Sequence, residues 1–225
     1  MVFSNAEFVG DPTDAGGMHY LNPAHDPPGS IRDHYTGIGA VFAVHALDQL
    51  FAQFGRQIRV KRSRQLAWDE AKDSNLIFLG STTENLSLRE LPKQSDFVFK
   101  PIDSPSESRG CKILNLRPGP GEEPSYQGAV GLPTTEDYAL VAFLPAFESG
   151  RWVLILAGTT TLGTQAAVEF VCRPEALADL VDRLQLSNPD TPVPFEAVIK
   201  AEIAEDVPIH TEIVALHVRQ PGRKP

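Results

Sequence analysis

The sequence predicts a layered α/β fold: a Rossmann-like mixed sheet flanked by helices, with a C-terminal β-hairpin. Apolar runs at residues 75–85 and 152–165 end in Gly/Thr-rich loops and lead into helical patterns, and YTGIG at 35–39 opens an amphipathic run. Near the end of the chain, two alternating runs surround a polar turn, which indicates a hairpin. Strand–helix alternation followed by antiparallel strands is typical of a mixed sheet.

The first elements follow from apolar periodicity. Residues 38–54 carry apolar side chains at helical spacing, and Gly55 is a natural residue to end that helix. Residues 57–62 alternate basic and apolar side chains, which predicts a strand. Residues 68–73 indicate a short helix or turn, and residues 76–79 a compact buried strand.

The rest of the chain is predicted in the same way. Residues 86–91 indicate a helix start or a tight turn. Strands are expected at four apolar stretches: 97–100, 112–116, 137–147 and 152–157. A helix follows to about Cys172, and Pro174 begins another because proline fits the first helical position. The hairpin strands are expected at 195–203 and 211–218, around a turn at 205–208.

Three segments are expected along the chain. Residues 1–30, rich in Gly, Pro, Asp and Asn, form an irregular N-terminal segment or linker. Such a start fits a free-standing protein and also a fragment of a longer chain. Residues 31–186 form the α/β domain, and residues 187–225 form a hairpin that packs on it or extends it.

Composition excludes several classes of function. The chain has 225 residues and a formal net charge of -9, which argues against direct nucleic-acid binding. The longest apolar runs, at 139–147 and 152–158, are too short to cross a bilayer, so no membrane insertion is expected. No signal peptide is visible, and two cysteines outside any metal or redox spacing suggest a reducing, cytoplasmic location.

The first candidate binding loop follows the strand at 76–79. Glycine permits close backbone approach, and hydroxyl and amide groups add hydrogen-bonding capacity; the residues concerned are Gly80, Ser81, Thr82 and Asn85. The alternative is that Thr83 or Asn85 caps the next helix. The loop carries neither a P-loop nor a dinucleotide-binding fingerprint, so no particular cofactor is indicated.

The second candidate loop, at 158–165, joins a buried strand to a helix. Its candidate residues are Gly158, Thr159, Thr161, Gly163 and Thr164. The N–H groups of Gly163 and Thr164 are expected to hold an anion or a carboxylate at the helix N-terminus. The alternative is a Ser/Thr-rich cap.

Both loops are expected at the carboxyl ends of neighbouring parallel strands, where α/β proteins bind ligands. The segment at 35–39 is explained by a helix start that Thr36 caps.

No catalytic or metal centre is predicted. Five residues with ligating side chains gather near the N-terminus but match no ligand spacing: His19, His25, Asp26, Asp33 and His34. No G-x-S-x-G occurs. Glu84, Glu136 and Asp137 are possible general acids or bases, although solvated carboxylates are the default interpretation.

A basic run, RQIRVKRSR at 56–64, holds five positive residues in an acidic chain. It could bind a phosphate or contact an acidic neighbouring domain. Alternatively, it is the exposed face of an edge strand, where Lys and Arg discourage edge-to-edge pairing.

Three sequence segments carry a resemblance to known proteins: YTGIGAVFAVHAL, FLGSTTENLSLRELP and ILAGTTTLGTQAAVEFV. Over residues 33–173 the chain resembles uncharacterised C-terminal sensory or regulatory regions of bacterial regulator-like proteins. The resemblance implies a regulatory role and an N-terminal DNA-binding or signalling module in a longer chain. It supplies no catalytic residues.

The leading hypothesis is therefore a non-enzymatic ligand-sensing or regulatory domain that binds a small polar or anionic molecule between the two loops. One alternative is an enzyme that acts on a phosphate- or carboxylate-bearing substrate, with Glu84 or Asp137 as base. The other is a structural domain that forms a homodimer through its C-terminal hairpin.

Overall fold

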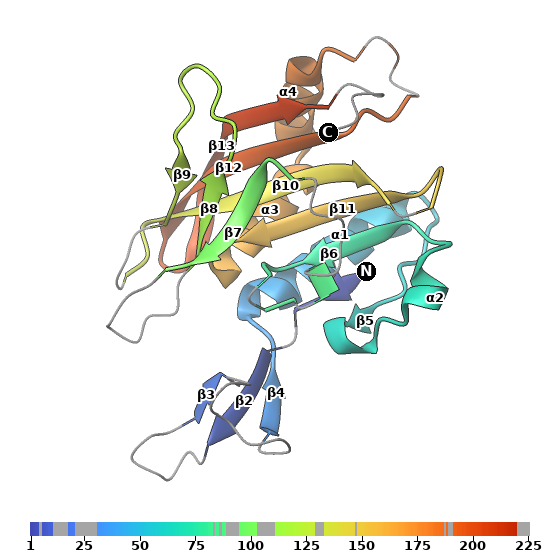
Figure 1. Ribbon diagram of the computed structural model, residues 1–225, viewed down its shortest axis with the longest axis vertical. Coiled ribbons are helices and arrows are strands. Elements are labelled where there is room, and N and C mark those ends of the chain that lie inside the picture. Colours follow the sequence, from blue (N-terminus) through green and yellow to red (C-terminus); the bar gives the residue numbers. More distant parts are fainter. Residues whose placement is uncertain are drawn as a thin grey trace.

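A computed structural model describes residues 1–4, 6–10, 18–20, 31–82, 84–85, 87–88, 95–102, 111–128, 133–146, 148–186, 188 and 191–219. A seven-stranded mixed sheet forms its centre (Figure 1). In spatial order its strands are β13 (Val207–Val218), β12 (Phe195–Ala204), β10 (Glu136–Pro145), β11 (Trp152–Gly158), β6 (Leu76–Leu79), β1 (Val2–Phe3) and β5 (Lys61–Arg62). The strands from β11 to β5 are parallel, and β10, β12 and β13 extend the sheet through antiparallel pairs.

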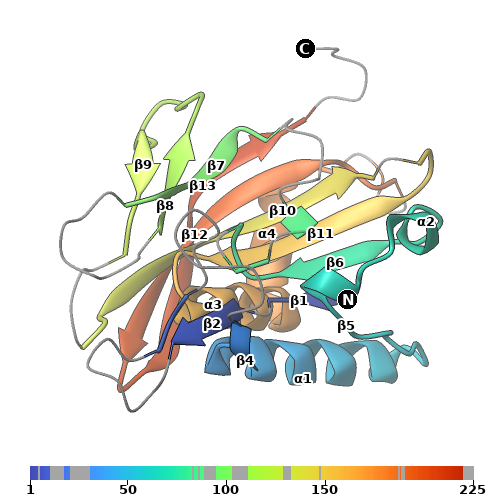
Figure 2. The same cartoon turned by 60° about the horizontal axis from the view of Figure 1, so that its bottom comes forward.

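The two faces of this sheet are covered differently (Figure 2). On one face lie three helices: α1 (Ile38–Gln53), α3 (Thr161–Cys172) and α4 (Pro174–Leu184). On the other face lies a three-stranded sheet: β7 (Phe97–Pro101), β8 (Cys111–Asn115) and β9 (Ser125–Tyr126). Because side chains alternate along a strand, Val141 packs toward the helices and Leu140 toward the small sheet.

The mixed sheet, its flanking helices and the C-terminal hairpin are confirmed. A Rossmann-like arrangement is not confirmed. The long helices all pack on one face, and three of the six pairs of neighbouring strands are antiparallel. Parallel strands joined by helical crossovers would instead place helices on both faces.

The hairpin joins β12 to β13, with Ile199 opposite Ile213. Glu205 and Asp206 form its turn with φ of 50° and 60°, which matches the right-handed twist of the strands. The turn is shorter than expected, because Pro208 already pairs with Ile203. Since β12 also pairs with β10, the hairpin extends the main sheet.

The N-terminal segment is more regular than its composition indicates. Val2–Phe3 pairs within the main sheet, between β6 and β5. A separate antiparallel sheet contains β2 (Ala6–Gly10), β3 (Met18–Tyr20) and β4 (Ile31–Tyr35). The expected segment boundaries at residues 30 and 186 stay predictions.

Three local predictions need correction. The strand at 57–62 is reduced to Lys61–Arg62, because only these residues pair with β1. Helix α3 begins at Thr161, so residues 161–165 belong to the helix and not to a loop. Thr36 does not cap α1: Gly37 is the N-cap, and the Thr36 hydroxyl donates to the Ser4 carbonyl at 2.9 Å.

The remaining elements are short, and part of what the sequence predicts lies outside the described residues. A 3-10 turn, η1 (Ser63–Gln65), and a short helix, α2 (Trp68–Ala71), connect β5 to β6. Most of the segment predicted at 86–91 lies outside the described residues, as do the side chains of the five N-terminal residues with ligating groups.

Candidate functional site

The two candidate loops lie at the same edge of the sheet, as predicted. Leu79 of β6 pairs with Leu156 of β11 in a parallel register, so Gly80, which follows β6, and Gly158, which ends β11, lie at the carboxyl ends of neighbouring strands. The Gly80 N–H donates to the Leu156 carbonyl at 3.1 Å. The Cys111 thiol, at the start of β8, contacts both loops, through the Thr159 carbonyl at 3.2 Å and the Ser81 hydroxyl at 3.9 Å.

A carboxylate does occupy the N-terminus of α3, but it belongs to the protein. Asp137, fully buried on β10, accepts the Gly163 N–H at 2.7 Å and the Thr160 hydroxyl at 2.6 Å. It also accepts the Tyr138 N–H at 2.7 Å, the Thr160 N–H at 3.2 Å and the Thr159 hydroxyl. The donors that the sequence assigned to a ligand are therefore engaged within the fold.

The other threonines of this segment stabilise the strand–helix junction. Thr160 is the N-cap of α3 and accepts the Leu162 N–H at 3.1 Å. The Thr164 hydroxyl accepts the Gly158 N–H at 3.0 Å. Thr161 accepts the Gly39 N–H of α1 at 3.0 Å, so its side chain joins two helices. These contacts favour the Ser/Thr-cap alternative for residues 158–165.

The first loop is also tied to the sheet. The Asn85 amide donates to the Val2 carbonyl at 3.1 Å and to the Leu79 carbonyl at 3.0 Å, which links the turn to β1 and β6. Its Oδ1 atom is buried and has no hydrogen-bond partner among the described residues. Gly80 has φ of 89° and lies close to Ser4, where a Cβ would meet the Ser4 Cβ at 2.8 Å. Ser81 is buried and Thr82 half-buried.

Of the possible general acids or bases, Asp137 is buried, Glu84 is half-buried, and the half-buried Glu136 pairs with Lys200 at 2.9 Å. Burial raises the pKa of Asp137, while hydrogen bonds from Thr159, Thr160, Tyr138 and Gly163 oppose that change. Both of its oxygens are engaged, so it presents no acceptor to a substrate. Burial also raises the pKa of Glu84, at the first loop. Among the described residues, no group of three or more His, Cys, Asp and Glu is placed to hold a metal ion.

A cleft of about 810 Å³ lies at the opposite, amino ends of β6 and β11. Its wall contains Phe143 and Trp152, whose rings stack with centroids 4.5 Å apart and planes 7° apart. The Trp152 backbone N–H donates to the Asn75 side chain at 3.0 Å. Further apolar residues line the cleft: Phe51, Ile58, Leu66, Leu76, Ile77 and Leu154. This volume is in the range of small-molecule pockets.

Three basic residues line the same cleft, and none of the described residues that line it is acidic. They are Arg56, Arg59 and Lys61, all from the basic run that the sequence singled out. Within the described part of the chain, no carboxylate pairs with the side chain of Arg56 or Arg59. In a chain of net charge -9, this local positive charge attracts an anion.

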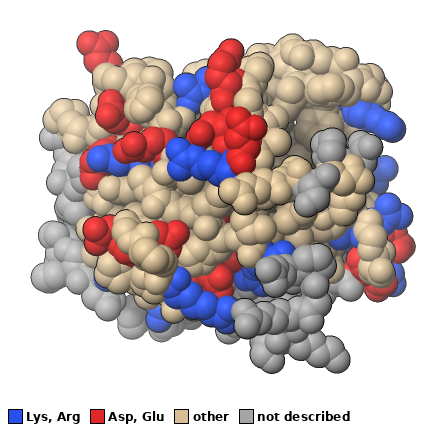
Figure 3. Space-filling model, turned by 90° about the horizontal axis from the view of Figure 1, so that it is seen from above, with Lys and Arg blue, Asp and Glu red and all other residues tan. Residues whose placement is uncertain are grey.

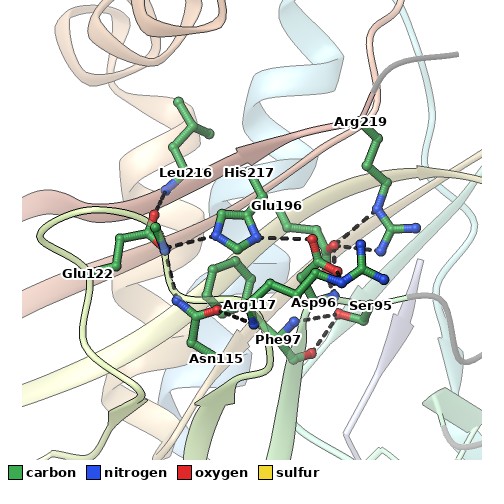
Figure 4. Close-up of polar contacts among 11 residues, drawn as sticks. Ser95, Asp96, Phe97, Asn115, Arg117, Glu122, Glu196, Leu216, His217 and Arg219 are labelled. Atoms are coloured by element: carbon green, nitrogen blue, oxygen red, sulfur yellow. Dashed lines mark hydrogen bonds and ion pairs between the residues drawn. The ribbon is translucent and has the colours of Figure 1, made fainter. Parts of the chain in front are cut away.

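A second polar cluster joins the small sheet to the hairpin (Figure 4). His217 of β13 lies between two carboxylates, with Nδ1 3.0 Å from Asp96 and Nε2 2.8 Å from Glu122. Only the protonated ring donates to both. Burial lowers the pKa of His217, but hydrogen bonds and charge from Glu122 and Asp96 outweigh this and raise it.

The neighbours of His217 complete this cluster. Burial raises the pKa of Glu122, yet hydrogen bonds from Gly119, His217, Asn115 and Leu216 lower it overall. Beside it, the buried Glu196 accepts from Arg219 at 2.7 Å. Since both ring nitrogens are engaged, the cluster has the character of a structural connection and not of a reactive site.

Charges on the surface are mixed. On the face shown in Figure 3, Lys and Arg side chains lie beside Asp and Glu, and the described residues of that face form no continuous basic surface. Within the described part of the chain, no helix combines the length and apolar character needed to cross a bilayer.

Comparison with protein-family models, curated proteins and solved structures finds no match for this chain.

Proposed function

We propose that this chain is a non-enzymatic ligand-sensing or regulatory domain that binds a small organic anion in the cleft at the amino ends of β6 and β11. One observation carries the proposal: Arg56 and Arg59 line the same cleft as the stacked rings of Phe143 and Trp152. Among the described residues, neither arginine has a carboxylate partner. Positive groups fix an anion, and apolar walls supply the free energy of burial.

The proposed site lies at the opposite end of the strands from the crevice that the sequence predicted. At that edge, Gly163, Thr159 and Thr160 donate to Asp137, and the Asn85 amide donates to the backbone. An external anion would have to displace a buried carboxylate that already has these donors. The cleft imposes no such cost, because its arginines have no described carboxylate to give up.

The mechanism would be differential binding to two arrangements of the cleft. Two residues separate residues 56–58 from the end of α1, and the Arg56 N–H donates to the Phe51 carbonyl at 3.0 Å, so a ligand that orders this segment also acts on the end of α1. Helix α1 contacts the N-terminus of α3 through Gly39 and Thr161. An attached N-terminal module or a second copy of the chain would read the resulting shift.

The test is a fluorescence titration with 8-anilinonaphthalene-1-sulfonate, an amphipathic anion, at fixed ionic strength. We expect saturable binding to the unmodified protein and a loss of about tenfold in affinity for the double variant Arg56→Gln/Arg59→Gln, equivalent to about 1.4 kcal/mol. Arg183→Gln is the matched control, because Arg183 lies on α4 and pairs with Asp179.

Circular dichroism and thermal melting of each variant must accompany the titration, because this dye also binds loosened proteins. Equal affinity in the double variant and the control, with unchanged melting, would contradict the proposal. So would the lack of a saturable phase in the unmodified protein.

A further inference from the structure

The aromatic wall of the cleft is built to be rigid. Phe143 on β10 and Trp152 on β11 are diagonal neighbours across an antiparallel pair, since Phe143 faces Leu154 and Pro145 faces Trp152. Phe143 is supported from behind by Phe195 of β12, with ring centroids 6.2 Å apart. The bond from Trp152 N–H to Asn75 fixes the start of β11. Both wall rings therefore hold their places without a ligand.

The Trp152 side chain also carries a hydrogen-bond donor. Trp152 is half-buried, and among the described residues no partner is recorded for its indole N–H. Tryptophan offers an apolar face together with a donor at its edge, which suits a guest with an apolar body and a polar substituent.

A planar aromatic side chain favours a planar ligand. An aromatic guest gains stacking contacts with Trp152 beyond those that follow from its buried area, equivalent to about two- to tenfold in affinity. A flexible alkyl chain lacks this gain and loses rotational freedom when it is ordered. The cleft volume of about 810 Å³ leaves room for a fused-ring compound.

We infer that the ligand is a planar aromatic carboxylate whose rings stack on the face of Trp152 that is turned away from Phe143 and whose anionic group faces Arg56 and Arg59. This inference rests on the proposed function and specifies the class of anion. Ring recognition and charge recognition are supplied by different residues, so each can be tested separately.

The experiment is isothermal titration calorimetry of the whole chain with three carboxylates at one ionic strength: 2-naphthoate, decanoate and acetate. Naphthoate and decanoate have similar carbon counts and differ in shape. We expect naphthoate to bind about fivefold or more tightly than decanoate, and acetate to give no saturable heat. Decanoate that binds as tightly as naphthoate would overturn the inference.

Three variants assign the effect to the ring. Trp152→Leu should weaken naphthoate binding about three- to tenfold and change decanoate binding less than twofold, whereas Trp152→Phe should restore most of the naphthoate affinity. Phe99→Leu is the control, because Phe99 of β7 packs on the other face of the sheet. An equal loss for both ligands in Trp152→Leu would overturn the inference.

The outcomes separate the inference from the function on which it rests. If 2-naphthoate and decanoate bind with equal affinity, and the binding of both depends on Arg56 and Arg59, the cleft binds organic anions but does not select aromatic ones. If neither these carboxylates nor the naphthalene sulfonate binds in an arginine-dependent way, the proposed function fails as well.

Discussion

At the scale of single residues, Asp137 has the largest effect on the structure. A negative group at a helix N-terminus interacts favourably with the helix dipole and with the unpaired N–H groups there. Asp137 supplies that group from β10, so the start of α3 is fastened to a neighbouring strand. The Gly/Thr-rich composition of residues 158–164 follows: Gly163 lets the carboxylate approach, since a Cβ there would lie 2.5 Å from Asp137 Oδ2.

Replacing Asp137 with Asn should therefore destabilise the fold. The amide keeps the shape but offers one acceptor where the carboxylate offers two, so N–H groups of α3 lose their partner. We expect the free energy of unfolding to fall by about 2–4 kcal/mol. Urea denaturation measures it, with the exposed Asp182→Asn of α4 as control. A loss no larger than that of the control would show that the carboxylate is not needed.

Much of this junction could be predicted from the sequence, and its occupant could not. The glycines and threonines predicted a strand, a tight turn and an anion at a helix start. Asp137 lies twenty-six positions before Gly163, and only the pairing of β10 with β11 brings them together. Likewise, the basic run was visible, but its aromatic partners Phe143 and Trp152 reach the cleft only through the sheet.

At the scale of elements, two contacts determine how the layers join. The first is the crossing of α1 and α3 at Gly39. A Cβ on Gly39 would lie 2.0 Å from the Thr161 carbonyl oxygen, so the small residue permits the helices to touch. Because that oxygen belongs to the backbone, the helices would have to move apart to admit a methyl group.

Gly39→Ala should thus lower the free energy of unfolding by about 1–3 kcal/mol, through overpacking. Gly119→Ala is a suitable control, since the nearest atom to a Cβ there is 3.5 Å away, on the flexible Glu122 side chain. Thermal melting of both variants measures the difference. Similar melting of the two variants would mean that the helix contact adjusts without cost.

The second contact is the His217 cluster, which fastens the small sheet to β13. The pKa of His217 is raised in the folded protein, so its contribution is present below the ordinary value of 6.5 and is lost as pH rises through the higher folded pKa. The pKa of Glu122 is lowered, so its contribution is present above 4.5 and is lost as pH falls through the lower folded pKa.

The cluster should accordingly stabilise the protein most between about pH 4.5 and 6.5. His217→Gln should lower the free energy of unfolding by about 1–3 kcal/mol at pH 5.5, and by less at pH 9. Urea denaturation at both pH values measures this, with the exposed His210→Gln of β13 as control. A deficit that is equal at the two pH values would rule out a contribution from the charged ring.

At the scale of the whole molecule, the two ends of the parallel strands differ. The carboxyl ends of β6 and β11 are closed by internal contacts of Asp137, Asn85 and the threonines. The amino ends open into the cleft, with positive charge and aromatic rings. We propose that the ligand binds at the amino ends, although parallel sheets usually bind ligands at the opposite edge.

Mapping of amide chemical shifts in ¹H–¹⁵N NMR spectra during titration with 8-anilinonaphthalene-1-sulfonate tests this proposal. We expect saturable shifts to concentrate at residues 56–61, 74–77 and 152–154, while residues 80–85 and 158–164 change little. Saturable shifts confined to residues 80–85 and 158–164 would contradict it and would return the binding site to the carboxyl edge of the sheet.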